Sequence, residues 1–256
     1  MNKSTGMEKV AIIPSTVGFH WEELYDAYKV FKSEGWEIDL YTDLGKPAKV
    51  DPKSIEKHPL LSLLGLGVSD SNSPATELGK EISYRTAADV KAIYDMVPEN
   101  YDAIYLPGGH GCLLDVNVNP TLHEKIYQAY KAGKILSAVC HATSTFAFVK
   151  DEALSIVAGK KITGFPDVLD NILIKTGWVY EQYLPLPFSN QKKLEEAGAD
   201  IKTTDVLQSN VNPYYHVTDL PFITGAGPKT AKSVAQKVVA AVFMKKFELK
   251  KELIYT

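Results

Sequence analysis

The sequence predicts an α/β fold with a single doubly wound, mostly parallel sheet sandwiched by helices. Residues 9–14 form a short apolar run closed by proline, which is typical of a buried strand. Residues 21–34 carry apolar side chains at helical spacing, and residues 36–41 alternate as a strand does. Strand, helix and strand in this order form the unit of a parallel sheet. The chain ends on the same theme, with a predicted strand at 221–224 and a long helix from Lys229 to about Phe247.

The middle of the chain adds an insertion and further alternating elements. Four prolines break residues 42–88, which we interpret as an insertion or cap at about 43–88 within one domain spanning 1–256. A short helix is expected near 54–64. Beyond the insertion, strands are predicted at 103–106, 135–139, 161–164 and 205–208, and helices at 88–96, 122–132, 169–175 and 191–197. Because ligands bind beyond the carboxyl ends of such strands, the turns at 15–18, 107–111, 140–142 and 164–170 are expected to converge.

The composition excludes several classes of protein. The 256 residues are 45% hydrophobic and carry 28 basic and 31 acidic side chains, for a net charge of −3. With no run rich in Lys and Arg, this balance argues against nucleic acid as a partner. No apolar run is long enough for a membrane helix, and no signal peptide is visible. The two cysteines, Cys112 and Cys140, form no disulfide framework and predict a cytoplasmic location.

Cys140 is the candidate nucleophile. The apolar strand 135–139 runs directly into Cys140 and then into a helix rich in small residues. At such a turn, backbone N–H groups and the helix dipole favour negative charge, which predicts a thiolate-prone cysteine with a lowered pKa. The alternative is a buried cysteine at the end of a core strand.

Acidic and basic partners for Cys140 occur nearby. His141 follows it and is a candidate general base, which a third group would orient. Asp167 and Asp170 both follow the next predicted strand; by pattern alone Asp167 suits a helix cap, and Asp170 remains a candidate for the third group. Glu22 and Glu23 suit the first turn of a helix, although a carboxyl group beside a cysteine could also hydrogen-bond the sulfur or carry a proton.

A glycine-rich turn follows the strand at 103–106. Gly108 and Gly109 let the backbone approach a ligand, and together with His110 they are candidates to bind the substrate and to supply the N–H groups of an oxyanion hole. By the motif alone, a simple tight turn is favoured. The six histidines show no metal-binding spacing, and neither a dinucleotide fingerprint nor a P-loop is present. We therefore expect no metal and no bound cofactor.

Together these residues resemble the ThiJ/PfpI superfamily, which has a flavodoxin-like, class I glutamine amidotransferase-like fold. Residues 138–141, AVCH, are similar to its AxCH nucleophile elbow. The glyoxalase III and stress-chaperone branch is the most similar, through LPGGHGCLLDV at 106–116, DPKS at 51–54 and KKITGFPDVLD at 160–170. The resemblance covers about residues 9–243.

The resemblance implies roles for particular residues. Glu23 would hydrogen-bond the cysteine, with Glu22 as the alternative, and the N–H groups of Gly109 and His141 would form the oxyanion hole. Asp170 stands where this branch usually has glutamate. Because aspartate is shorter by one methylene, a triad requires the backbone at this position to lie closer to His141. Two further departures affect the pocket wall: residues 142–144 replace a common Gly-Pro, and residues 178–189 are unusually aromatic.

The resemblance also implies cofactor-free chemistry on small reactive carbonyls, as in a glyoxalase III-like lyase or a related deglycase. Cys140 would add to the aldehyde of a 2-oxoaldehyde such as methylglyoxal, and His141 or Glu23 would move a proton from C1 to C2 before a thioester is hydrolysed. The superfamily is usually homodimeric, so a homodimer is expected.

Two other functions remain open. A Cys-His-acid triad also serves a cysteine amidase or peptidase. Alternatively, Cys140 could be a redox sensor in a stress holdase that binds unfolded chains through apolar residues near 60–66 or 184–188. A glutamine amidotransferase is disfavoured, because those enzymes carry a downstream His-x-Glu pattern, whereas His216 is followed by Val217 and Thr218.

Overall fold

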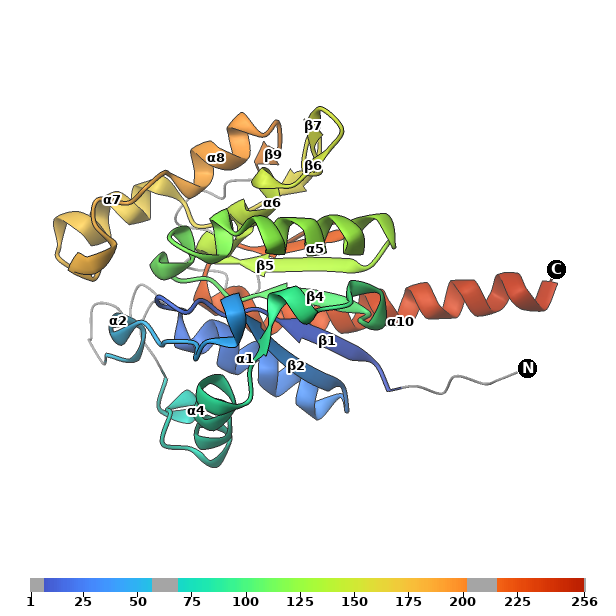
Figure 1. Ribbon diagram of the computed structural model, residues 1–256, viewed down its shortest axis with the longest axis horizontal. Helices are drawn as coiled ribbons and strands as arrows, with labels where there is room; N and C mark the ends of the chain where they lie inside the picture. Colours follow the sequence, from blue (N-terminus) through green and yellow to red (C-terminus); the bar gives the residue numbers. More distant parts are fainter. Residues whose placement is uncertain (1–6, 57–68, 202–215, 256) are drawn as a thin grey trace.

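A mostly parallel sheet forms the centre of the molecule in the computed structural model, which describes residues 7–56, 69–201 and 216–255 (Figure 1). Within these residues the sheet has seven strands, in the spatial order β10 (His216–Asp219), β11 (Phe222–Gly225), β5 (Ile135–Val139), β4 (Ala103–Leu106), β1 (Lys9–Ile12), β2 (Glu37–Thr42) and β3 (Lys91–Ala92). All neighbours are parallel except β10 and β11. The predicted fold class is confirmed.

Helices cover both faces of this sheet. On one face, α1 (Trp21–Ser33) and α10 (Ala231–Tyr255) pack over Val10 and Ile12 of β1. On the other, α5 (Pro120–Lys131) and α6 (Thr145–Phe148) pack over Ala11. Because successive strand residues face opposite sides and both sides are covered, the central strands are mostly buried and mostly apolar.

The remaining elements lie around this core. The segment at 43–88 contains α2 (Pro52–Ile55) and α4 (Glu77–Ala88). It is tied to α1 by a hydrogen bond from the Trp21 indole to the Asn72 carbonyl, and by another from the Tyr28 hydroxyl to Glu81. After β5 come two small two-stranded sheets and two helices: β6 (Lys150–Asp151) with β7 (Leu154–Ser155), β8 (Lys161–Ile162) with β9 (Asp200–Ile201), α7 (Asp167–Lys175) and α8 (Asn190–Glu196).

Some of the predicted elements were wrong or cannot be compared. The helix predicted at 88–96 is wrong: α4 ends at Ala88, and Lys91 instead pairs with Tyr41 at the edge of the sheet. Ile93 and Met96 are both buried, and their spacing by three residues imitates a helical pattern. The antiparallel strand β10 was not predicted. The strand at 205–208 and most of the helix at 54–64 lie outside the described residues.

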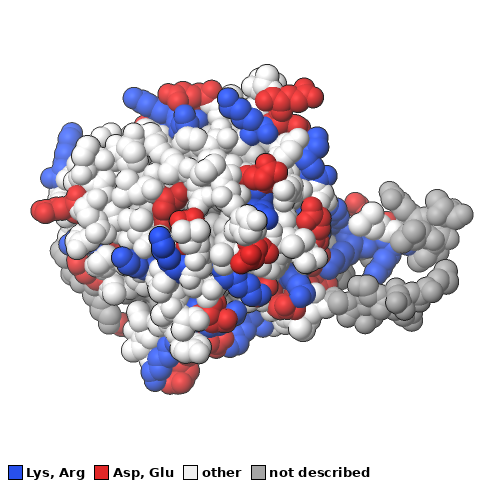
Figure 2. Space-filling view, viewed as in Figure 1, with Lys and Arg blue, Asp and Glu red and all other residues white. Residues whose placement is uncertain are grey.

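The surface gives little indication of a charged partner on the side drawn in Figure 2, where basic and acidic side chains are interspersed. None of the helices in the described ranges is both long and apolar enough to cross a membrane. The feature that positions the site is the sheet edge at the carboxyl ends of β1, β4 and β5, where the turns after these three strands meet.

Candidate active site

Cys140 lies immediately after β5, at the first residue of a 3-10 turn (Cys140–Ser144) that leads into α6. Its backbone is in the left-handed region, with φ of 57°. A non-glycine residue there costs about 1–3 kcal/mol and persists only where the surroundings fix it. Asn190 helps to fix this turn, because its side-chain oxygen accepts the Ser144 N–H at 3.2 Å and its amide donates to the Phe165 carbonyl at 3.3 Å. The strand-to-helix turn predicted from the sequence is confirmed.

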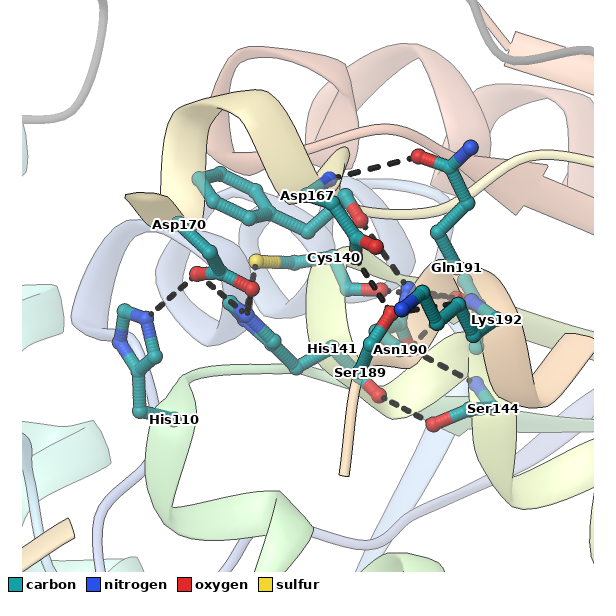
Figure 3. A network of polar contacts seen from close by, with 12 residues as sticks. His110, Cys140, His141, Ser144, Asp167, Asp170, Ser189, Asn190, Gln191 and Lys192 are labelled. Carbon is teal, nitrogen blue, oxygen red and sulfur yellow. Dashed lines mark hydrogen bonds and ion pairs between the residues drawn. The ribbon is translucent and has the colours of Figure 1, made fainter. Parts of the chain in front are cut away.

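A Cys-His-Asp triad is assembled around this turn (Figure 3). The Cys140 Sγ atom lies 3.2 Å from Nδ1 of His141, and Nε2 of His141 lies 3.0 Å from both carboxylate oxygens of Asp170. His141 and Asp170 are only 1% and 5% exposed. The short side chain of Asp170 reaches His141 because it projects from the first turn of α7. Asp167 begins that helix and instead accepts a hydrogen bond from the Ser189 hydroxyl.

His110 has a role that the sequence did not reveal. Its Nε2 lies 2.9 Å from Oδ1 of Asp170, so one carboxylate oxygen contacts two histidines. The ring of His110 is also stacked on Tyr183, with centroids 6.4 Å apart. Burial raises the pKa of Asp170, but the charge of His141 and hydrogen bonds from both histidines outweigh it, so this pKa lies below its usual range. Burial and the neighbouring His141 lower the pKa of His110.

Glu23, and not Glu22, faces the nucleophile. Its Oε2 accepts the Gly108 N–H at 2.6 Å, while its buried Oε1 has no hydrogen-bond partner. Gly108 allows this approach because a Cβ there would lie 2.8 Å from the Cys140 Cβ and 2.9 Å from Glu23 Oε2. Glu22 points elsewhere, to Lys229 at 3.5 Å and to the Ser69 N–H.

The expectation that Cys140 has a lowered pKa is wrong. Burial, and then the nearby Glu23 carboxyl, raise the pKa of the thiol, and the hydrogen bond from the His141 N–H does not offset them. Burial also raises the pKa of Glu23 to about 8, because the hydrogen bonds from Gly108 and Cys140 offset it only in part. Burial therefore favours the protonated form of both the thiol and the Glu23 carboxyl group. Deprotonation of the thiol has to be coupled to the reaction, with His141 as the base within reach.

We expect Glu23 to make the protein less stable as the pH rises. The native state keeps the Glu23 proton up to about pH 8, whereas the unfolded chain releases it near the ordinary value of 4.5. Between these pH values the native state holds the extra proton, so the free energy of unfolding falls by about 1.4 kcal/mol per pH unit from this group. Urea unfolding of wild type and Glu23→Gln from pH 5 to 8 measures the difference. Equal slopes would contradict the assignment, and Glu34→Gln, at an exposed position after α1, is the control.

The predicted oxyanion donors differ in availability. The Gly108 N–H is occupied by Glu23, so Gly108 positions that carboxyl group. Gly109 lines the cavity beside Cys140, with φ of 116°, and a Cβ there would lie 2.7 Å from the His20 nitrogen. The N–H of His141 points to the cysteine sulfur. Gly109 is therefore the candidate donor that lines the cavity, and His141 is a candidate whose N–H is directed at the sulfur in the resting site.

The cavity beside Cys140 is small, about 50 Å³, against roughly 300 Å³ or more for pockets that take drug-sized ligands. Asp51, Lys53 and Ser54 of the 43–88 segment form one part of its wall. Of the aromatic residues at 178–189, Trp178 lines the cavity, with Lys53 Nζ 5.4 Å from its ring centroid. Residues 60–66, considered as a binding surface, lie outside the described part of the chain.

Cys112, the other cysteine, is a core residue. It is fully buried, and its thiol donates to the Pro107 carbonyl at 3.4 Å. It belongs to the core on the α5 face of the sheet. Cys140 is therefore the cysteine at the cavity.

A buried Cys-His-Asp triad on a strand-to-helix turn of a doubly wound sheet defines the class of α/β proteins with a nucleophile elbow. The DJ-1/PfpI family model matches residues 68–241, more than half of the chain, and the chain belongs to this family.

Several relatives are glyoxalases. A glutathione-independent glyoxalase of Schizosaccharomyces pombe is 28% identical over 88% of this chain and 89% of its own length. A second glutathione-independent glyoxalase, from Saccharomyces cerevisiae, is 27% identical over 86% of this chain and 87% of its own length. The crystal structure of glyoxalase III from Candida albicans has a TM-score of 0.70 and 25% identity, covering 92% of this chain and 97% of that one. The resemblance to the glyoxalase III branch inferred from the sequence is confirmed.

Proposed function

We propose that this protein is a glutathione-independent glyoxalase that converts small 2-oxoaldehydes to 2-hydroxy acids without a cofactor. The observation that carries the proposal is the placement of Cys140, His141 and Asp170 at a cavity of about 50 Å³. The similarity to glyoxalases over most of the chain supports the reaction type. The narrow cavity supports a substrate of few atoms, such as methylglyoxal.

The first step is addition of the cysteine to the aldehyde. His141 takes the thiol proton through Nδ1 while sulfur bonds to C1, and the imidazolium is stabilised by the ionised Asp170. The carbonyl oxygen gains negative charge, which the N–H groups of Gly109 and His141 would stabilise. The imidazolium then returns its proton to that oxygen, giving a hemithioacetal and a neutral histidine.

The second step moves a proton from C1 to C2. We assign this proton transfer to His141 because its side chain lines the cavity, whereas the Glu23 carboxyl group accepts a hydrogen bond from the Gly108 N–H. Transfer of the C1 proton to the C2 oxygen gives an enediol. Addition of a proton to C2 and loss of the proton of the C1 hydroxyl then give a thioester of the 2-hydroxy acid. C1 is oxidised as C2 is reduced, so no external oxidant is required. Water then cleaves the C1–S bond, releasing the acid and the thiol.

We infer that the 43–88 segment is a cap that completes the pocket of a single domain. Its residues Asp51, Lys53 and Ser54 line the cavity, and its Thr76–Glu81 region packs against α1. This cap would limit substrate size. A longer 2-oxoaldehyde is therefore expected to have a higher KM than methylglyoxal.

The direct test is lactate formation from methylglyoxal in glutathione-free buffer. We expect turnover by the wild-type protein that added glutathione does not increase. An absence of lactate, or a strict requirement for glutathione, would overturn the proposal. Hydrolysis of amides with no lactate formed would favour the hydrolase alternative.

We further propose a cytoplasmic homodimer, on the family likeness and on two cysteines that are both free thiols. Light scattering of the purified chain should give twice the monomer mass of 28.2 kDa. A monomer mass at micromolar concentration would rule the dimer out.

A further inference from the structure

Asp170 makes one contact that the proposed reaction does not use, with His110. Nε2 of His110 and Nε2 of His141 both point at the Asp170 carboxylate, at 2.9 and 3.0 Å (Figure 3). One ligand atom from each of the three residues lies within 4.8 Å of the others, and all three residues are buried. Across the described ranges, this is the group of His, Cys, Asp and Glu side chains close enough to hold a metal ion.

The arrangement is close to that of a zinc site. Two histidines and a carboxylate, with an open position for water, are a common ligand set for Zn²⁺. Ligand atoms 2.0–2.2 Å from a tetrahedral zinc lie about 3.3–3.6 Å apart. The two N···O contacts of 2.9 and 3.0 Å have to lengthen by a few tenths of an ångström to reach this separation, and the two histidine ligand atoms already lie within 4.8 Å of each other. His110 and His141 line the cavity, which provides access and room for a bound water.

The surroundings also suit a metal. Metal-ligating side chains are usually oriented by contacts on the side away from the ion. The two rings are held in place on their other sides, His110 by stacking on Tyr183 and His141 by its Nδ1 contact with Cys140.

We propose that His110, His141 and Asp170 form a site for Zn²⁺ or a similar divalent transition metal, and that the metal reversibly inhibits the enzyme. Sulfur is not a ligand, because Cys140 contacts the opposite ring nitrogen of His141. Metal on Nε2 moves the proton of the neutral His141 ring from Nε2 to Nδ1, so no proton is lost from this side chain. Nδ1 then already carries a proton, so His141 cannot take the proton of the Cys140 thiol and cannot form the imidazolium that the reaction requires.

Metal binding is measured first, without substrate, so that this inference and the proposed function can fail separately. Tag-free protein is titrated with Zn²⁺ against a chromophoric chelator. We expect one Zn²⁺ per chain in wild type and in Cys140→Ser, and affinity about 100-fold weaker in His110→Asn. His123→Asn is the control, because His123 contacts the Asn117 carbonyl away from the cluster and its loss should leave affinity unchanged. Loss of binding in Cys140→Ser, or unchanged affinity in folded His110→Asn, would overturn the site.

The cobalt spectrum gives a second readout that does not depend on how well His110→Asn folds. With Co²⁺ bound to wild type, we expect visible bands of a nitrogen- and oxygen-ligated ion and no thiolate-to-cobalt charge-transfer band. A charge-transfer band that disappears in Cys140→Ser would place the metal on sulfur and contradict the proposal.

The proposal that bound metal inhibits the enzyme rests on the proposed function. Lactate formation by wild type should fall in proportion to zinc occupancy and return after a chelator is added. Binding at the site with turnover unchanged would overturn the inhibition alone. Binding in a protein that makes no lactate would leave the metal site standing and the proposed function rejected.

Discussion

Cys140→Ala is expected to reduce lactate formation by about 10⁴-fold or more, because the new S–C1 bond and the thioester both require the sulfur. The fold should be retained, since the change removes one atom from a side chain at the cavity surface. The measurement is kcat/KM for methylglyoxal, with circular dichroism and thermal unfolding as checks on the fold.

Cys112→Ala is the matched control for that experiment. Both cysteines are buried, but Cys112 lies in the core and donates to the Pro107 carbonyl. Its loss is expected to lower stability and to leave kcat/KM of the folded protein largely unchanged. Turnover that survives in Cys140→Ala, or that disappears in folded Cys112→Ala, would contradict the assignment of the nucleophile.

Asp170→Asn is expected to lower kcat by about 10²- to 10⁴-fold with little change in KM. The carboxylate accepts hydrogen bonds from Nε2 of both His110 and His141, and its charge favours the imidazolium. The amide of asparagine carries no charge, so it cannot stabilise the charged form of His141, and its NH₂ group cannot accept the hydrogen bond that the second carboxylate oxygen accepts. Steady-state kinetics of the two proteins measure the effect.

Asp170→Glu separates charge from position. It restores the glutamate usual in the similar branch and keeps the charge, but it adds one methylene where the side chain is 5% exposed. We expect kcat between those of wild type and Asp170→Asn. An Asp170→Asn enzyme within about threefold of wild type would show that this acid does not complete the triad.

Much of the fold followed from the sequence because a parallel sheet covered on both faces requires apolar strands and amphipathic helices. The runs that became β1, β4 and β5 are mostly apolar, and the spacing of α1 identified it as a helix. The short edge strand β3 escaped prediction because two residues carry no usable periodicity, and Ile93 and Met96 imitate a helix there.

The sequence indicated that Cys140, His141 and Asp170 lie close together, as they do in the structure. The pKa values of the site were predicted less well. Cys140 and His141 could be located because they follow the predicted strand directly. The choice between Glu22 and Glu23 depends on how α1 is rotated about its axis, which the sequence does not give. The contact of His110 with Asp170 joins residues 60 positions apart, so no local pattern could indicate it. The pKa of Cys140 was predicted in the wrong direction, because the helix-terminus argument omits burial and the neighbouring Glu23 carboxyl.

The central claim is that Cys140 becomes covalently bonded to the substrate during turnover. The most direct measurement is rapid acid quenching of the wild-type protein during turnover of methylglyoxal, followed by peptide mass spectrometry, because acid stops hydrolysis of the thioester and preserves it. The account predicts a mass increase of one methylglyoxal on the peptide that contains Cys140, absent after alkylation of the thiol and absent in Cys140→Ser. Lactate formation with no adduct on that peptide in any quenched sample would contradict it.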